Sequence, residues 1–236
     1  MPWTRCARCL PFCLPILVSV SACSGTYVKG GQGGDGGVEN PSPATSTADS
    51  APPSAEAGVA VGAPTESFKG LYFGACMSVL AAGRIDRVLR FYTEAKFTPD
   101  AAGGTGKLSL KLTALKLGEN KGPPPTVGKD QIVGTTLEIV DTPTTPAGVY
   151  AAAFGTASIP GEANPISGRP IVIEMTSLPG RFAKGKFCSQ MIGHVVQPTD
   201  IVLEGDVNTC LYLPVKEGEA TPVITNEDFA AGCPIR

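Results

Sequence analysis

The residue best suited to catalysis in this sequence is His194, the only histidine in the chain. An imidazole titrates near neutral pH, so His194 could serve as the base of a Ser-His-acid triad with nearby Ser189 and Asp200. The chain has no G-x-S-x-G elbow, and the spacing of these three residues does not identify them as a triad. The sequence therefore favours a structural role for His194 and leaves a hydrolase that uses it as an alternative.

Two further segments resemble ligand sites in part. Gly180 to Phe187 differs from a P-loop at one position, because Phe187 stands where a Ser or Thr hydroxyl must bind magnesium. We expect a basic hairpin loop there. Glu204, Asp206 and Asn208 alternate and would place oxygen ligands for calcium on one strand face. The other ligands of a calcium loop are missing, so we expect a solvated strand face and predict no metal or cofactor.

Four cysteines downstream of the linker are candidates for disulfides: Cys76, Cys188, Cys210 and Cys233. An even number of widely spaced cysteines in an oxidising compartment predicts two disulfides, for which three pairings are possible. We favour Cys76 with Cys188 and Cys210 with Cys233. Zinc binding is not expected, because none of the four has the close C-x-x-C spacing of a zinc site.

The elements that would position these residues are short β-strands. From Val88 to Phe97, apolar and polar residues alternate, as expected for a half-buried antiparallel strand. A second alternating run starts at Leu108 and changes phase near Ala114, which predicts a bulge or bend. Further strands are expected at 70–74, 131–140, 149–159, 170–178, 181–191 and 200–213.

These patterns predict an all-β fold, a single antiparallel sandwich or barrel of about eight strands. Residues 225 to 229 offer a cap and first-turn acids for one short C-terminal helical turn. Tyr72, Tyr92, Tyr150 and Tyr212 would suit either a recognition face or core packing, and packing is the expected role. The turn-rich segment 160–168 is expected to be a plain surface loop.

Composition separates this β domain, residues 67–236, from a linker. Residues 24–66 are rich in Gly, Ser, Pro and Ala and contain few large apolar side chains, so we expect a disordered tether. A flexible chain of this length reaches on the order of 35–40 Å. Sixteen basic and sixteen acidic residues follow residue 66. A neutral domain gives no electrostatic reason to expect nucleic acid as a partner.

The first 22 residues have the organisation of a signal peptide. Arg5 and Arg8 form a positive region, 10–20 is an apolar run, and Ser21-Ala22 is a small-residue cleavage site. The apolar run is about half the roughly 20 residues that a membrane span needs.

The segment Val20-Ser21-Ala22-Cys23 resembles the lipobox of bacterial lipoproteins. This resemblance implies cleavage after Ala22, lipid attachment at Cys23 and a linker of residues 23–66 on the mature chain. Ser24 stands where an Asp would imply retention at the inner membrane, so the resemblance favours the outer membrane. The expected membrane contact is therefore the N-terminal lipid anchor.

The sequence favours a non-enzymatic function, in which the anchored β domain binds an unknown protein or envelope polymer. The alternative is a carrier, in which the strands close around an apolar ligand and Phe182 and Phe187 contribute to the pocket. An apolar internal cavity would support the carrier, a cleft containing His194 would support the hydrolase, and a filled core with an exposed aromatic patch would support the binding module.

Overall fold

The computed structural model describes residues 62–153, 155–183, 185–230 and 232–233. The strands are β1 (Phe68–Cys76), β2 (Leu89–Pro99), β3 (Gly106–Leu115), β4 (Thr126–Val127), β5 (Ile132–Thr144), β6 (Val149–Ala152), β7 (Gly155–Ile159), β8 (Ile171–Ala183), β9 (Lys186–Gln190), β10 (Ile192–Gln197), β11 (Ile201–Leu203), β12 (Thr209–Val215) and β13 (Glu219–Ala220). The described helical elements are α1 (Asn226–Ala230) and the 3-10 turns Ile85–Arg87, Glu119–Lys121, Lys129–Gln131 and Gly161–Ala163.

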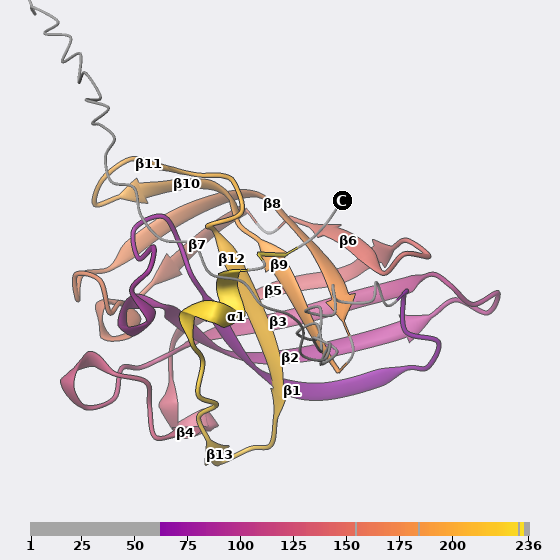
Figure 1. The fold of residues 1–236 in the computed structure, drawn as a ribbon, viewed down its shortest axis with the longest axis horizontal. Coiled ribbons are helices and arrows are strands. Elements are labelled where there is room, and N and C mark those ends of the chain that lie inside the picture. Colours follow the sequence, from indigo (N-terminus) through magenta and orange to yellow (C-terminus); the bar gives the residue numbers. More distant parts are fainter. Residues whose placement is uncertain (1–61, 154, 184, 231, 234–236) are drawn as a thin grey trace, which may run out of the picture. The chain divides into compact units, whose positions relative to one another are not determined.

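Within the described residues, eight antiparallel strands close into a barrel, in the order β8-β6-β5-β3-β2-β1-β12-β9, and β9 pairs with β8 to complete the ring. Figure 1 shows β1, β2, β3 and β5 running side by side along one wall. The sequence left sandwich and barrel open, and the structure is a barrel. Closure removes the exposed edges that an open sheet of this size would have.

Strand β8 belongs to the barrel and to a smaller sheet. Its first half pairs with β7 and β10, and β11 adds to β10. Its second half pairs with β6 and β9. The strand break predicted at Pro179-Gly180 is therefore wrong. Pro179 lies between Ser177, the last residue paired with β10, and Gly180, the first paired with β9, so its missing amide hydrogen falls where β8 changes partners.

Other predicted strand limits also change. The segment 200–213 is two strands, β11 and β12, because Gly205 adopts φ +80° in the turn between them. The segment 149–159 likewise divides into β6 and β7. The phase change near Ala114 is confirmed, since the pairing of β3 with β5 shifts register between Leu112 and Ala114.

Alternating side chains fill the barrel interior. Aromatic rings gather at the end where β1 begins, and aliphatic residues from β2, β3, β5, β7 and β8 occupy the other end. A second buried cluster lies on the outer face of β1 and includes Phe73, Ala75, Leu211 and Phe229. Helix α1 contributes Phe229 and lies beside β12 in Figure 1.

The predicted C-terminal helical turn is confirmed as α1. The Asp228 carboxylate accepts hydrogen bonds from the Thr225 amide at 2.8 Å and from the Thr225 hydroxyl at 3.0 Å. These bonds fix the chain at the start of the helix, as the capping residues predict.

Candidate functional site

A pocket of about 390 Å³ opens at the aromatic end of the barrel. We call it the mouth pocket; it is lined by Gly62, Pro64, Phe68, Tyr72, Phe182, Ala183, Gly185, Lys186 and Phe187. Its volume falls in the range of small-molecule sites, roughly 300–1,000 Å³.

Three parts of the chain form the walls of the mouth pocket. Strand β1 supplies Phe68 and Tyr72, and the β8–β9 hairpin supplies Phe182 and Phe187. The hairpin turns tightly because Gly185 adopts φ +69°. The third wall is the segment before β1, where the Ala63 amide donates a hydrogen bond of 3.2 Å to the Pro146 carbonyl of the β5–β6 turn. This bond holds Gly62 and Pro64 against the barrel.

The aromatic rings of the mouth pocket contact one another and the interior. Phe182 packs edge-on against Phe68, with ring centroids 6.1 Å apart, and against Phe97 at 5.3 Å. Tyr72 packs edge-on against Phe187 at 4.9 Å. Phe182 and Phe187 are buried, whereas Phe68 and Tyr72 are partly exposed. The pocket therefore presents aromatic surface to solvent above a rigid, packed floor.

Two polar groups lie at this aromatic surface. Lys186 is exposed and, among the described residues that line the mouth pocket, is the only lysine, arginine, aspartate or glutamate. Burial raises the pKa of Tyr72, so its hydroxyl remains a neutral hydrogen-bond donor at neutral pH. Among the described residues, no hydrogen-bond partner of the Tyr72 hydroxyl is found. Both groups are thus available to a ligand.

Deeper in the barrel, the described residues enclose a much smaller space. The apolar cavity at the other end has a volume of about 30 Å³ and is lined by residues that include Phe91, Leu112 and the Cys76–Cys210 disulfide. A cavity of this size is close to the share of one water molecule and cannot hold an enclosed organic ligand. The interior is therefore a packed core, and the mouth pocket is the aromatic opening onto it.

The two expected disulfides are present, but their predicted pairing is wrong. Cys76 pairs with Cys210, and Cys188 pairs with Cys233. Cys76 and Cys210 are direct cross-strand neighbours on β1 and β12, with Cα atoms 4.0 Å apart. Their side chains are only 2% exposed. This bridge therefore joins two adjacent barrel strands from inside.

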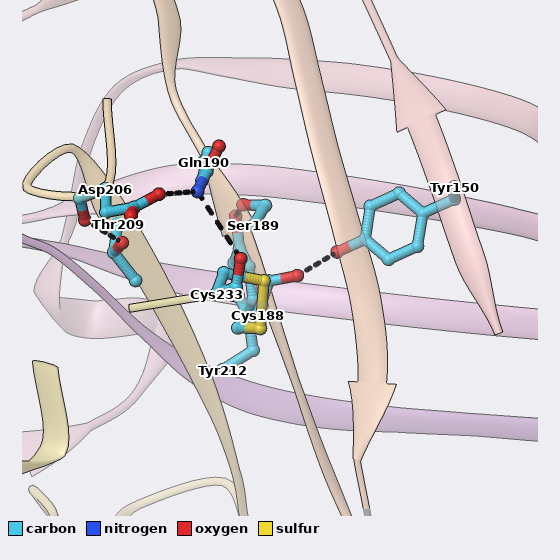
Figure 2. Close-up of a disulfide and its surroundings, with 8 residues drawn as sticks. All are labelled: Tyr150, Cys188, Ser189, Gln190, Asp206, Thr209, Tyr212 and Cys233. Carbon is cyan, nitrogen blue, oxygen red and sulfur yellow. Dashed lines mark hydrogen bonds between the residues drawn. A yellow bond between two sulfur atoms is a disulfide. The ribbon is translucent and has the colours of Figure 1, made fainter. Parts of the chain in front are cut away.

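The Cys188–Cys233 disulfide attaches the C-terminal segment to β9 (Figure 2). Beside it, the Gln190 amide donates to the Asp206 carboxylate at 2.6 Å and to the Cys233 carbonyl at 3.4 Å. The Tyr150 hydroxyl donates to the Cys188 carbonyl at 2.9 Å from within the barrel. The Tyr150 ring passes so close to Gly180 that a Cβ there would lie 2.3 Å from it. These contacts give the region a structural role.

The four tyrosines do not form one recognition face. Tyr150 and Tyr212 are buried in the core, as expected for packing, and Tyr72 lines the mouth pocket. Tyr92 lies outside the barrel, where its hydroxyl donates to Glu217 at 2.6 Å. Ser189 is fully buried, and its hydroxyl lies 3.2 Å from the Tyr212 hydroxyl.

The buried tyrosines predict a loss of stability in alkaline solution. Burial raises the pKa of Tyr212 to about 12 and raises that of Tyr150 well above its usual range. An unfolded tyrosine ionises near pH 10. The stabilisation of the folded state by these neutral, buried tyrosines is therefore complete below pH 10. It decreases as the pH rises from 10 through 12, and the free energy of unfolding falls by about 2–3 kcal/mol for Tyr212 alone. Urea unfolding at pH 9 and pH 11.5 measures this difference.

Tyr212→Phe provides the control, because phenylalanine cannot ionise. We expect its stability to decrease less than that of the wild type between the two pH values. An equal decrease in both proteins would contradict the assignment to Tyr212.

His194 does not belong to a triad. It lies on β10 with its side chain half exposed, and its Nδ1 atom is 3.3 Å from an oxygen of Asp200, which is 78% exposed. Ser189 faces Tyr212 within the core. Ser189 therefore lies apart from the His194–Asp200 pair, and the described residues contain no cleft that joins His194 to a hydroxyl and a carboxylate.

The partial calcium and phosphate motifs are structural. Asn208 is fully buried. Its side-chain NH2 group donates to the Glu204 backbone carbonyl at 2.6 Å, and its side-chain oxygen Oδ1 accepts from the Val79 amide at 2.9 Å. Glu204 to Asn208 thus form a turn and not a strand face. In the P-loop-like segment, Phe182 pairs with Phe187 and Ala183 with Lys186, which confirms the predicted hairpin. Among the described residues, no group of three or more His, Cys, Asp or Glu could hold a metal ion.

The segment 160–168 is a turn organised by Asn164. The Asn164 side-chain amide donates to the Ser167 hydroxyl at 2.9 Å and to the Arg169 carbonyl at 2.7 Å, and its carbonyl oxygen accepts from the Ile166 amide. The sequence predicts a plain surface loop here, but Ala163, Asn164 and Pro165 are buried and Ala163 belongs to the interior cluster, so the middle of the segment is packed.

A larger hollow of about 580 Å³ lies on the outer face of β1, β2, β3 and β5. Its side chains carry both signs of charge, and Lys111 forms a 2.7 Å salt bridge with Glu138. Both side chains are about half exposed, so this pair contributes little energy. Because the charges are mixed and exposed, this hollow defines no ligand chemistry as sharply as the mouth pocket does.

Sequence reasoning named Phe182 and Phe187 for an apolar pocket but missed Phe68, Tyr72 and Lys186. The alternation of the β1 segment was a usable signal, since Phe68 and Tyr72 fall on one face. Cys23, Ala22 and the leader lie outside the described residues. No helix among the described residues is both long enough and apolar enough to cross a membrane. Comparison of the chain with protein-family models, curated proteins and solved structures gives no match.

Proposed function

We propose that this protein is a lipid-anchored lipoprotein of the bacterial cell envelope whose β-barrel binds an apolar or aromatic group in the mouth pocket. The observation that supports binding is the mouth pocket itself, an aromatic hollow of about 390 Å³ above a packed core. The lipobox-like residues Val20 to Cys23 support the anchor. Lipid chains at Cys23 would hold the protein on the outer membrane, and the linker would give the barrel reach.

The packed interior distinguishes this function from that of an enclosing carrier. A carrier needs a cavity that buries most of its ligand, whereas the internal cavity here is about 30 Å³. The mouth pocket is open, so it suits a group presented from outside. That group could belong to an envelope polymer, a protein or a free small molecule. The arrangement of His194, Ser189 and Asp200 offers no support for hydrolysis.

The pocket is tested with Ala183→Trp, which adds a large ring to its wall without removing a core side chain. We expect wild-type protein to bind the neutral fluorescent probe N-phenyl-1-naphthylamine, and the variant to bind it at least tenfold more weakly because the indole occupies the pocket. Measurements use the mature chain with Cys23→Ser, so that no acyl chain competes for the probe. The binding constant is obtained by fluorescence titration.

Ala220→Trp is the matched control, because Ala220 is exposed on β13 and does not line the mouth pocket. It should bind the probe as the wild type does. Circular dichroism melting of both variants tests whether the barrel stays folded. Probe binding that is equal in wild type and folded Ala183→Trp would refute the pocket assignment.

A further inference from the structure

Within the residues that the structure describes, the mouth pocket combines an apolar body with a single charged side chain. Its lining contains four aromatic residues, Phe68, Tyr72, Phe182 and Phe187, and the cation Lys186. The described part of the lining contains no carboxylate that could neutralise the ammonium group. An aromatic and aliphatic surface favours the burial of apolar ligand groups, and the ammonium group favours an anion near them.

The position of Lys186 places this charge at the rim. It is the first residue of β9 and pairs with Ala183 across the hairpin, whereas Phe182 and Phe187, one position further along each strand, are buried. An apolar group that contacts Phe182 and Phe187 would therefore leave its polar end near Lys186. The Tyr72 hydroxyl, which has no hydrogen-bond partner among the described residues, can donate to an oxygen of the same ligand.

We propose that the ligand of the mouth pocket is an anionic amphiphile, a molecule with an aryl or acyl body and a carboxylate, sulfonate or phosphate at one end. This inference rests on the proposed binding function and specifies its ligand class. The apolar body occupies the aromatic floor, and the anionic end remains at the rim beside Lys186. A partly exposed charge pair of this kind affects affinity modestly and is screened by salt.

The test compares ligands that have unbranched alkyl bodies of similar length and opposite charges. Decanoate and decyltrimethylammonium compete with N-phenyl-1-naphthylamine for the mature chain carrying Cys23→Ser. We expect decanoate to compete about tenfold more strongly at low salt. Lys186 attracts the carboxylate and repels the quaternary ammonium, so the difference in binding free energy is about twice the energy of one exposed charge interaction. This preference should decrease at 1 M NaCl, where the Debye length is about 3 Å.

Lys186→Glu should weaken decanoate about tenfold and leave the neutral probe nearly unchanged. Lys116→Glu is the matched control, since Lys116 is exposed and does not line the pocket. It follows the last residue of β3, whereas the mouth pocket lies at the end of the barrel where β3 begins. It should leave both ligands unchanged, and melting curves show whether each variant is folded.

The outcomes separate the two proposals. If the probe does not bind wild-type protein, both the binding function and the ligand class are refuted. If the probe binds and Ala183→Trp blocks it, but the two amphiphiles compete equally, the binding function stands and the anionic ligand is refuted. The anionic ligand is also refuted if decanoate binds folded Lys186→Glu as strongly as wild type.

Discussion

Replacing both Cys76 and Cys210 with alanine should lower the free energy of unfolding by about 4–5 kcal/mol, the value that the chain-entropy model gives for a loop of 134 residues. Native disulfides of small exported domains typically contribute about 2–5 kcal/mol. Because small proteins are stable by only about 5–15 kcal/mol, this loss would remove much of the margin. Urea denaturation monitored by circular dichroism measures it.

The location of the bridge adds to this expectation. Cys76 and Cys210 are nearly inaccessible and line the interior cavity of about 30 Å³. Alanine at both positions would remove two sulfur atoms from the core and enlarge that cavity, which costs further stability because packed interiors collapse only partly. The bridge also joins β1 to β12, strands far apart in sequence that are neighbours only in the closed barrel.

The matched control is the double alanine variant at Cys188 and Cys233. This disulfide closes a shorter loop, 45 residues, so the same model gives about 1 kcal/mol less. The Cys188 side chain also lies on the outer side of the barrel, where it packs against the second buried cluster, the one that includes Phe73 and Phe229. If removal of Cys188–Cys233 proves the more destabilising, the view that Cys76–Cys210 is the main covalent stabiliser of the barrel is wrong.

Local patterns predicted the elements that depend on near neighbours. The alternation between Val88 and Phe97 indicated β2, because strand side chains point alternately to the two faces. The cap and first-turn acids in residues 225–229 indicated α1, and the structure shows Thr225 bonded to Asp228, three residues later. The phase change at Ala114 indicated the irregular pairing with β5. Each of these signals is contained within a few residues.

Features that depend on strand order could not be read from the sequence. The pairing of Cys76 with Cys210 follows from the contact of β1 with β12, two strands that are far apart in the sequence. The continuation of β8 through Pro179 depends on the exchange of β10 for β9 as partner. The mouth pocket likewise needs the closed ring, because closure brings Phe68 to Phe182. Contacts between residues that are far apart in the sequence leave no local sequence pattern from which they could be predicted.

The proposed lipid anchor at Cys23 predicts the second large effect. Cys23→Ala should move the protein almost completely from the membrane fraction to the soluble fraction, because alanine has no thiol to carry acyl chains. Each buried methylene contributes about 0.8 kcal/mol, so two or three chains hold a protein firmly on a bilayer and their loss removes that attachment. Fractionation followed by immunoblotting measures the change, and mass spectrometry of the N-terminal peptide identifies the acyl groups.

Cys13→Ala is the matched control, since Cys13 lies in the expected leader and outside the lipobox-like segment. Its product should stay on the membrane with Cys23 acylated. The anchor and the binding function can then be separated. A chain released by Cys23→Ala should still bind N-phenyl-1-naphthylamine, because the mouth pocket is built from residues 62–187. Unchanged membrane retention of Cys23→Ala, or a mature N-terminus without lipid, would contradict the proposed lipid anchor at Cys23.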